Sequence, residues 1–167
     1  LLIVADHAQH VATRPSALFQ GHVTMTTEDG LVLETDELLY DGYDGLAQSE
    51  GKVAWRRKDI SGTAIGMLYE GWSDSITFFK EVKIRLRDRD APPADIDADS
   101  ACLSREQNAL FLEGNVAVNQ GPNRTKSGSL QLFFGADRAI YRAVFRDGFE
   151  LVAQGDTGAL GFNFPRA

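Results

Sequence analysis

The chain has 167 residues, which is enough for one domain with a sizeable apolar core. Seventeen Lys and Arg residues against 24 Asp and Glu residues give a formal net charge of −7 at pH 7. This balance argues against a nucleic-acid-binding protein, because neutralising phosphates requires a basic face. Cys102 is the only cysteine, so no internal disulfide can form, and no apolar run approaches the roughly 20 residues of a membrane-spanning helix.

The amino-terminal run LLIV at 1–4 is short, and Asp6 and His7 close it. The sequence starts with Leu1 in the middle of this apolar run rather than with Met. We therefore expect that a signal peptide, an anchor helix or a preceding domain is missing from this sequence.

A short phrase recurs five times along the chain. It reads FQGHV at 19–23, SEGKV at 49–53, FFKEV at 78–82, LEGNV at 112–116 and, more loosely, FRDGF at 145–149. A recurrence of about 30 residues is the mark of stacked supersecondary units, none of which can bury its apolar face alone. The last residues of the five copies are the expected inward anchors: Val23, Val53, Val82, Val116 and Phe149.

A second phrase, small-Asp-x-apolar, precedes the first one. It reads ADHA at 5–8, TDEL at 35–38 and ADSA at 98–101, with a weaker copy, IGML, at 65–68. We interpret the repeating unit as a pair of strands wound over and over. Glycines at 21, 51 and 114 stand two residues before an anchor, and a glycine inside a strand marks a bulge or a bend. Aligned corners of this kind would fold the sheet into a V-shaped coil with an apolar inside.

Period-two alternation predicts strands along nearly the whole chain, and no window shows sustained helical spacing. Turn residues at 28–30, 40–42, 70–72 and 121–123 separate the strands. The charged, proline-containing segment 87–93 is predicted to be a loop between two halves of one sheet stack. We expect a single all-β domain over 1–167. The same alternation places the apolar residues Ile65, Met67 and Tyr69 together on the inward face of one strand.

Few polar clusters in the sequence indicate chemistry. His7 and His10 lie near Asp6, but no further His or Cys completes a zinc site, so we interpret them as a solvated strand end. Asp95, Asp97 and Asp99 share one strand face without the glycine and glutamate of a calcium loop. We interpret them as an exposed face or an edge guard. No phosphate loop, dinucleotide fingerprint or nucleophile elbow occurs, and no enzyme activity is expected.

Two further groups of side chains, the cations and the large apolar residues, each allow a functional interpretation. Lys83, Arg85, Arg87 and Arg89 alternate along one strand, opposite an apolar face, and form either an ordinary solvated face or a contact for anionic groups at a groove mouth. The many aromatic and Met side chains either fill a narrow core or line an interior left open for an apolar ligand.

The two phrases resemble the lipopolysaccharide-transport periplasmic family, the OstA-like domains of LptA, LptC and the amino-terminal part of LptD. The residues that carry the resemblance are Ala5–Ala8, Thr35–Leu38, Ala98–Ala101, Gly21–Val23, Gly51–Val53, Gly114–Val116 and Leu39–Asp41. Residues 1–90 look more like LptC, and residues 91–167 look more like LptA. The resemblance implies an open, V-shaped β-jellyroll of stacked antiparallel strands.

The resemblance also implies a function, a location and partners. The family carries lipopolysaccharide through a shared apolar groove in the periplasm, between the inner and the outer membrane. The expected partners are lipopolysaccharide, other Lpt β-jellyroll proteins joined end to end, and the inner-membrane Lpt ABC transporter complex; an N-terminal helix outside this sequence would supply an anchor. No cofactor is expected. The terminal strands around Leu2–Val4 and Gly158–Phe164 would carry partner contacts. The residues expected to line the groove are Met25, Leu33, Tyr40, Trp55, Met67, Tyr69, Phe78, Ile84, Leu112, Val118, Leu132 and Phe134.

Two other functions remain open at this stage. A self-assembling structural β-coil would have a dry, filled core and would form homopolymers without lipid. A β-sandwich enzyme acting on polysaccharide would need two carboxylates such as Asp95 and Asp97 in a cleft.

Overall fold

The computed structural model describes residues 1–11, 15–87, 92–135 and 140–152, and every regular element in these ranges is a β-strand. Twelve strands follow one another along the described part of the chain. None of the described residues forms a helix long and apolar enough to cross a membrane. The strands are β1 (Leu2–Val4), β2 (His7–Val11), β3 (Ser16–Thr26), β4 (Val32–Asp41), β5 (Leu46–Arg57), β6 (Ile60–Glu70), β7 (Ser75–Leu86), β8 (Ala94–Ala98), β9 (Ser100–Ser104), β10 (Ala109–Gln120), β11 (Asn123–Phe134) and β12 (Ile140–Val152).

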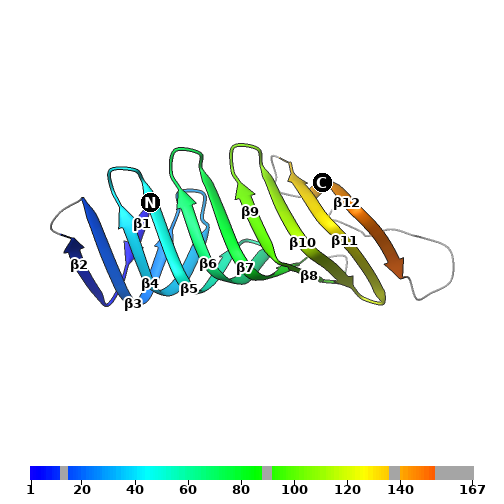
Figure 1. Ribbon diagram of the computed structural model, residues 1–167, viewed down its shortest axis with the longest axis horizontal. Helices are drawn as coiled ribbons and strands as arrows, with labels where there is room; N and C mark the ends of the chain where they lie inside the picture. The colour runs from blue at the N-terminus through cyan, green and yellow to red at the C-terminus, as the bar shows by residue number, and fades with distance from the viewer. Residues whose placement is uncertain (12–14, 88–91, 136–139, 153–167) are drawn as a thin grey trace.

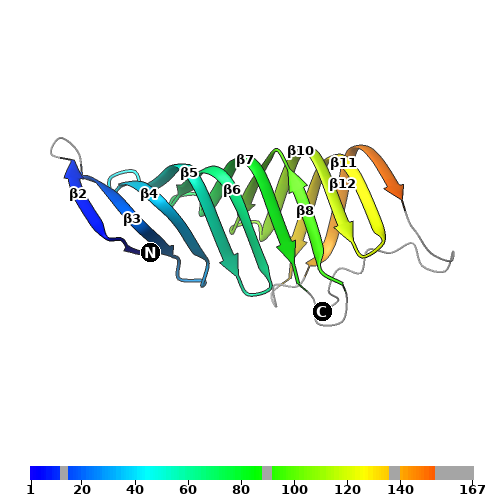
Figure 2. The same ribbon diagram turned by 90° about the horizontal axis from the view of Figure 1, so that it is seen from below.

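All strand pairs are antiparallel and belong to one sheet. Figures 1 and 2 show the strands side by side along the long axis, in chain order. The sheet continues across the expected loop at 87–93, because β7 pairs with both β8 and β9. Part of that loop, residues 88–91 with Arg89 among them, lies outside the described residues, and so does 158–164.

The long strands bend at the same level, and the bends form a crease along the molecule (Figures 1 and 2). Register shifts mark it in six strand pairs, and at the crease the extra residue always falls on the strand that carries a copy of the five-fold phrase, with Gly-x-Val in β3, β5 and β10 and its looser forms in β7 and β12. Gly21 and Gly114 have φ angles of +75° and +77°, which residues with a Cβ rarely adopt. The predicted corners are therefore β-bulges that recur in each winding.

The crease divides the sheet into two limbs. One set of strand halves ends in the turns at 42–45, 71–74 and 105–108, which lie at the top of Figure 1, and we call these halves the front limb. The rear limb consists of the halves that end in the turns at 27–31, 58–59 and 121–122, together with β1 and β8. The short strands β1 and β2, like β8 and β9, act as one bent strand interrupted at an aspartate, since both members pair with the same neighbour, β3 or β10.

The inner faces of the two limbs meet in one apolar core. Four of the five expected anchors, Val23, Val53, Val82 and Val116, lie in it and are at most 1% exposed. The inward assignment of Phe149 is wrong: this residue is 58% exposed, because it lies on β12, the last strand of the described sheet. The inward assignment of Ile65 is also wrong. It is 37% exposed because the bulge opposite Gly66, φ +76°, changes the side on which alternate residues point.

Candidate functional site between the two limbs

The residues expected to line a groove all point into the space between the limbs. Ten of them are buried, and the two tyrosines, Tyr40 and Tyr69, are half-buried near the free ends of the front limb. The front limb contributes Tyr40, Met67, Tyr69, Phe78, Leu112, Leu132 and Phe134, and the rear limb contributes Met25, Leu33, Trp55, Ile84 and Val118.

An aromatic stack joins the limbs in the middle of this space. Trp55 on the rear part of β5 and Phe78 on the front part of β7 have ring centroids 5.3 Å apart and planes 15° apart. The indole also lies over Gly62, where an added Cβ would come within 2.6 Å of the ring. Gly62 therefore leaves the room that the Trp55 ring occupies. The indole nitrogen is buried and has no hydrogen-bond partner among the described residues.

The interior is packed along its length. One continuous cluster of buried residues runs from Val23 to Ile140 and includes Met67 and Leu132, both 0% exposed. Side chains of the two limbs thus occupy the space that a ligand would need. Of the two possibilities left open by the sequence, this structure has the filled interior.

At the free edges of the limbs, which we call the mouth, a group of charged side chains meets. Asp29 lies in the rear-limb turn after β3, and its carboxylate contacts Arg57 Nη1 at 2.8 Å and Arg105 Nη1 at 3.2 Å. Arg105 lies in the front-limb turn after β9, where its Nε contacts Asp74 at 3.0 Å. The pair of Asp29 and Arg105 therefore crosses the mouth from one limb to the other.

Electrostatics at the mouth favour the charged form of Asp29. Burial alone would raise the pKa of its carboxyl group, but the hydroxyl of Thr27 donates to it and Arg105 and Arg57 attract it. The net effect is a pKa below the ordinary value. Burial, together with the nearby Asp74 carboxylate, raises the pKa of Tyr69, whose side chain approaches the same cluster.

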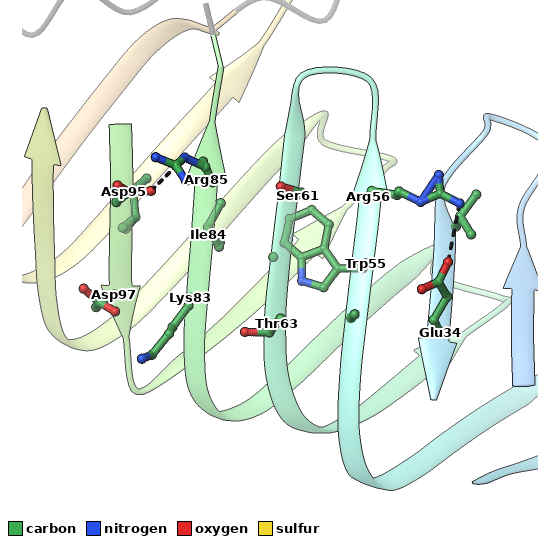
Figure 3. Close-up of a pocket in the computed structure, with 14 residues that line it drawn as sticks. Glu34, Trp55, Arg56, Ser61, Thr63, Lys83, Ile84, Arg85, Asp95 and Asp97 are labelled. Atoms are coloured by element: carbon green, nitrogen blue, oxygen red, sulfur yellow. Dashed lines mark hydrogen bonds and ion pairs between the residues drawn. The ribbon is translucent and has the colours of Figure 1, made fainter. Parts of the chain in front are cut away.

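The outer face of the rear limb carries the alternating cations. A hollow of about 450 Å³ lies on β4 to β8. Figure 3 shows Ser61 and Thr63 in it, with Arg56 and Glu34 on one side and Lys83 and Arg85 on the other. Arg85 contacts Asp95 at 3.3 Å, and Lys83 stands opposite Asp97 in the strand register. The cations of β7 are thus matched by the acidic residues of β8, which form an exposed face of a central strand rather than an edge.

Two aspartates of the small-Asp-x-apolar phrase, Asp6 and Asp99, form hydrogen bonds across the crease. The backbone N–H groups of Asp6 and Asp99 donate to the carbonyl oxygens of Gly21 and Gly114, each at 2.9 Å. His22 Nδ1 lies 2.7 Å from the carboxylate of Asp6, and this hydrogen bond raises the pKa of the imidazole. The side chain of His22 thus faces solvent and is held by Asp6. The described residues include no group of three or more His, Cys, Asp or Glu side chains arranged for a metal ion.

The fold and this interior define an open β-jellyroll: stacked, creased antiparallel strands whose first and last members do not pair with each other. Residues 69–139 match the family model described as "Lipopolysaccharide-assembly, LptC-related". This match crosses the junction between 1–90 and 91–167, and over its length it confirms the resemblance to the lipopolysaccharide-transport family.

No curated protein matches the sequence. Among solved structures, the chain is similar to LptH from Pseudomonas aeruginosa, described as the LptA homologous periplasmic component of the conserved lipopolysaccharide transport device. The sequence identity is 12%, the match covers 92% of this chain and 94% of that chain, and the TM-score is 0.46.

Proposed function

We propose that this chain is a periplasmic, non-enzymatic module that binds lipopolysaccharide between its two limbs and passes it along its length. The family match over residues 69–139 and the continuous apolar interior support this proposal. The interior side chains named above would contact the acyl chains. Met67 and Leu132, both fully buried, are the most diagnostic of them.

An apolar path is what such a lipid needs. Burying one methylene group is worth about 0.8 kcal/mol, so exposing a chain of a dozen carbons to water costs on the order of 10 kcal/mol. Because the interior is packed, lipid must replace contacts between the limbs, starting with the stack of Trp55 on Phe78. Binding on this account separates the limbs, and the energy for transport comes from the inner-membrane Lpt ABC transporter complex rather than from this chain.

The two ends of the sheet would join neighbouring modules end to end. β1 and β2 at one end and β12 at the other lack a further partner strand among the described elements. Leu2 and Val4 on β1 and Phe149 and Val152 on β12 are exposed apolar residues at these ends. Unpaired edges with apolar side chains are suited to strand addition by another Lpt β-jellyroll protein.

A photoreactive residue placed at Met67 or Leu132 tests this proposal. We expect it to capture lipopolysaccharide in cells, whereas the same residue at the outward position Lys83 does not. Capture from Lys83 alone would contradict an interior path.

Val116→Asp should abolish lipid binding or folding, because it places a carboxylate in the core. Full activity of this variant would also contradict the proposal.

The packed interior also favours a second candidate, a structural module that assembles with its own copies and binds no lipid. The two candidates differ in solution behaviour. The structural module forms homopolymers regardless of lipid, while the transport module binds lipopolysaccharide. Sedimentation with and without lipopolysaccharide separates them.

A further inference from the structure

The charged cluster at the mouth joins segments that are far apart in the sequence. Asp29 lies between β3 and β4, Arg57 ends β5, and Arg105 lies between β9 and β10. The side chains of Asp29 and Arg105 are each 19% exposed, and that of Arg57 is 11% exposed. Ion pairs on the outer face are much more open to solvent; Arg56 and Glu34, for example, are 63% and 53% exposed.

The geometry assigns different tasks to the two arginines. Arg57 and Asp29 both belong to the rear limb, so their contact orders that limb alone. Arg105 is fixed to the front limb by Asp74 and by its own backbone N–H, which donates to the Asp74 carbonyl oxygen at 3.0 Å. Its second contact, to Asp29, spans the mouth. Two cations converge on one carboxylate, and only one of them comes from the opposite limb.

We propose that Asp29 and Arg105, supported by Arg57, form a latch that holds the mouth closed and keeps the apolar interior from opening sideways. If the limbs separate in this region, the contact between Asp29 and Arg105 breaks, because Asp29 moves with the rear limb and Arg105 moves with the front limb. The stack of Trp55 on Phe78 also joins these two limbs, so the latch and the stack are two separate contacts that hold the limbs together. The existence of the latch does not depend on the ligand; its role as a lateral gate for lipid rests on the proposed function.

Asp29→Asn is the sharpest variant, because it keeps the size of the side chain and removes the charge that both arginines share. Glu34→Gln is the matched control, since it removes an equally strong formal charge from an exposed pair within the rear limb. The probe is N-phenyl-1-naphthylamine, an uncharged dye that fluoresces in apolar surroundings, added to the purified chain without any lipopolysaccharide.

We expect Asp29→Asn to take up about fivefold more dye than the natural chain, the order of change that losing one partly buried charge pair makes in an equilibrium. Glu34→Gln should leave dye uptake unchanged. Equal uptake by the natural chain and Asp29→Asn would overturn the proposal, as would an equal rise in the control. Far-ultraviolet circular dichroism must show the same strand content in all variants.

A second variant keeps the proposal testable if Asp29→Asn unfolds. Arg57→Gln removes the supporting arginine and leaves the cross-mouth pair in place, whereas Arg105→Gln breaks the pair itself. Arg105→Gln should raise dye uptake more than Arg57→Gln, and the reverse order would overturn the proposal. Because these measurements contain no lipopolysaccharide, a failure of the lipid-transport proposal in cells would leave their outcome unaffected.

Discussion

Trp55 on the rear limb stacks on Phe78 on the front limb, with ring centroids 5.3 Å apart and planes 15° apart. The stack joins two halves of one creased sheet. It lies on the interior path along which the proposed lipid would travel. Its removal therefore affects stability and access to the interior together.

Trp55→Ala should lower the free energy of unfolding by about 3–5 kcal/mol, the usual cost of deleting a buried aromatic side chain. Trp55→Phe should cost much less, because a ring still packs on Phe78 and the buried indole N–H, unpartnered among the described residues, is removed. Denaturant titration measures both. Equal losses for the two variants would show that the ring contact contributes little.

The crease can be tested at one glycine. Gly114→Ala places a Cβ against the carboxylate of Asp99 at a φ of +77°, and we expect a loss of about 1–3 kcal/mol in the free energy of unfolding. Gly51→Ala is the control, because an added Cβ meets nothing closer than 4.0 Å there. If both substitutions had the same effect, the corner at Gly114 would not be a point of strain.

His22 and Asn115 are equivalent residues of the repeat. Asn115 Nδ2 donates to Asp99 at 2.8 Å, as His22 Nδ1 meets Asp6 at 2.7 Å. Because the folded pKa of His22 is raised, its contribution to stability is present below the unfolded pKa of about 6.5 and is lost as the pH rises through the folded value.

His22→Asn should therefore fold normally, since Asn tolerates the positive φ of this position, and should lose the small pH dependence that the imidazole contributes. Unfolding midpoints at pH 6 and pH 8 measure the effect. An unchanged difference between the two pH values would contradict the assignment to His22.

The latch predicts that stability falls at low pH, whereas the stabilising contribution of His22 is lost at high pH. The pKa of Asp29 is lowered in the folded chain, so its contribution is present above the unfolded value of about 3.9 and is lost as the pH falls through the folded value. Asp29→Asn should be less stable than the natural chain at pH 7. This difference should shrink as the pH falls through the folded pKa of Asp29 and vanish below it, where both side chains are neutral, and a gap that persists there would assign it to something other than charge.

Local patterns in the sequence predict most of the sheet. Period two places Met25, Leu33 and Ile84 correctly in the interior, because inward and outward residues alternate along each limb. The recurring glycines predict the crease. Ile65 shows the limit of this reasoning, since a bulge shifts the alternation by one residue.

The mouth could not be predicted in the same way. Asp29, Arg57 and Arg105 lie in or beside turns that no shared phrase connects, and they meet only because the sheet folds along its crease. Likewise, the repeat identifies Asp99 as a recurring residue but not as the partner of Asn115. The first contact depends on the angle between the limbs and the second on the local geometry of the bulge, and residue spacing encodes neither.

The distance between the limbs tests the central claim most directly. Spin labels at Gln48→Cys on the front part of β5 and Arg56→Cys on its rear part, in a Cys102→Ser background, report the opening of the V at two exposed outer positions. We predict that saturating lipopolysaccharide lengthens the distance between the labels, because acyl chains enter between Trp55 and Phe78. Lipopolysaccharide that binds at the same saturation and leaves this distance unchanged would contradict the account.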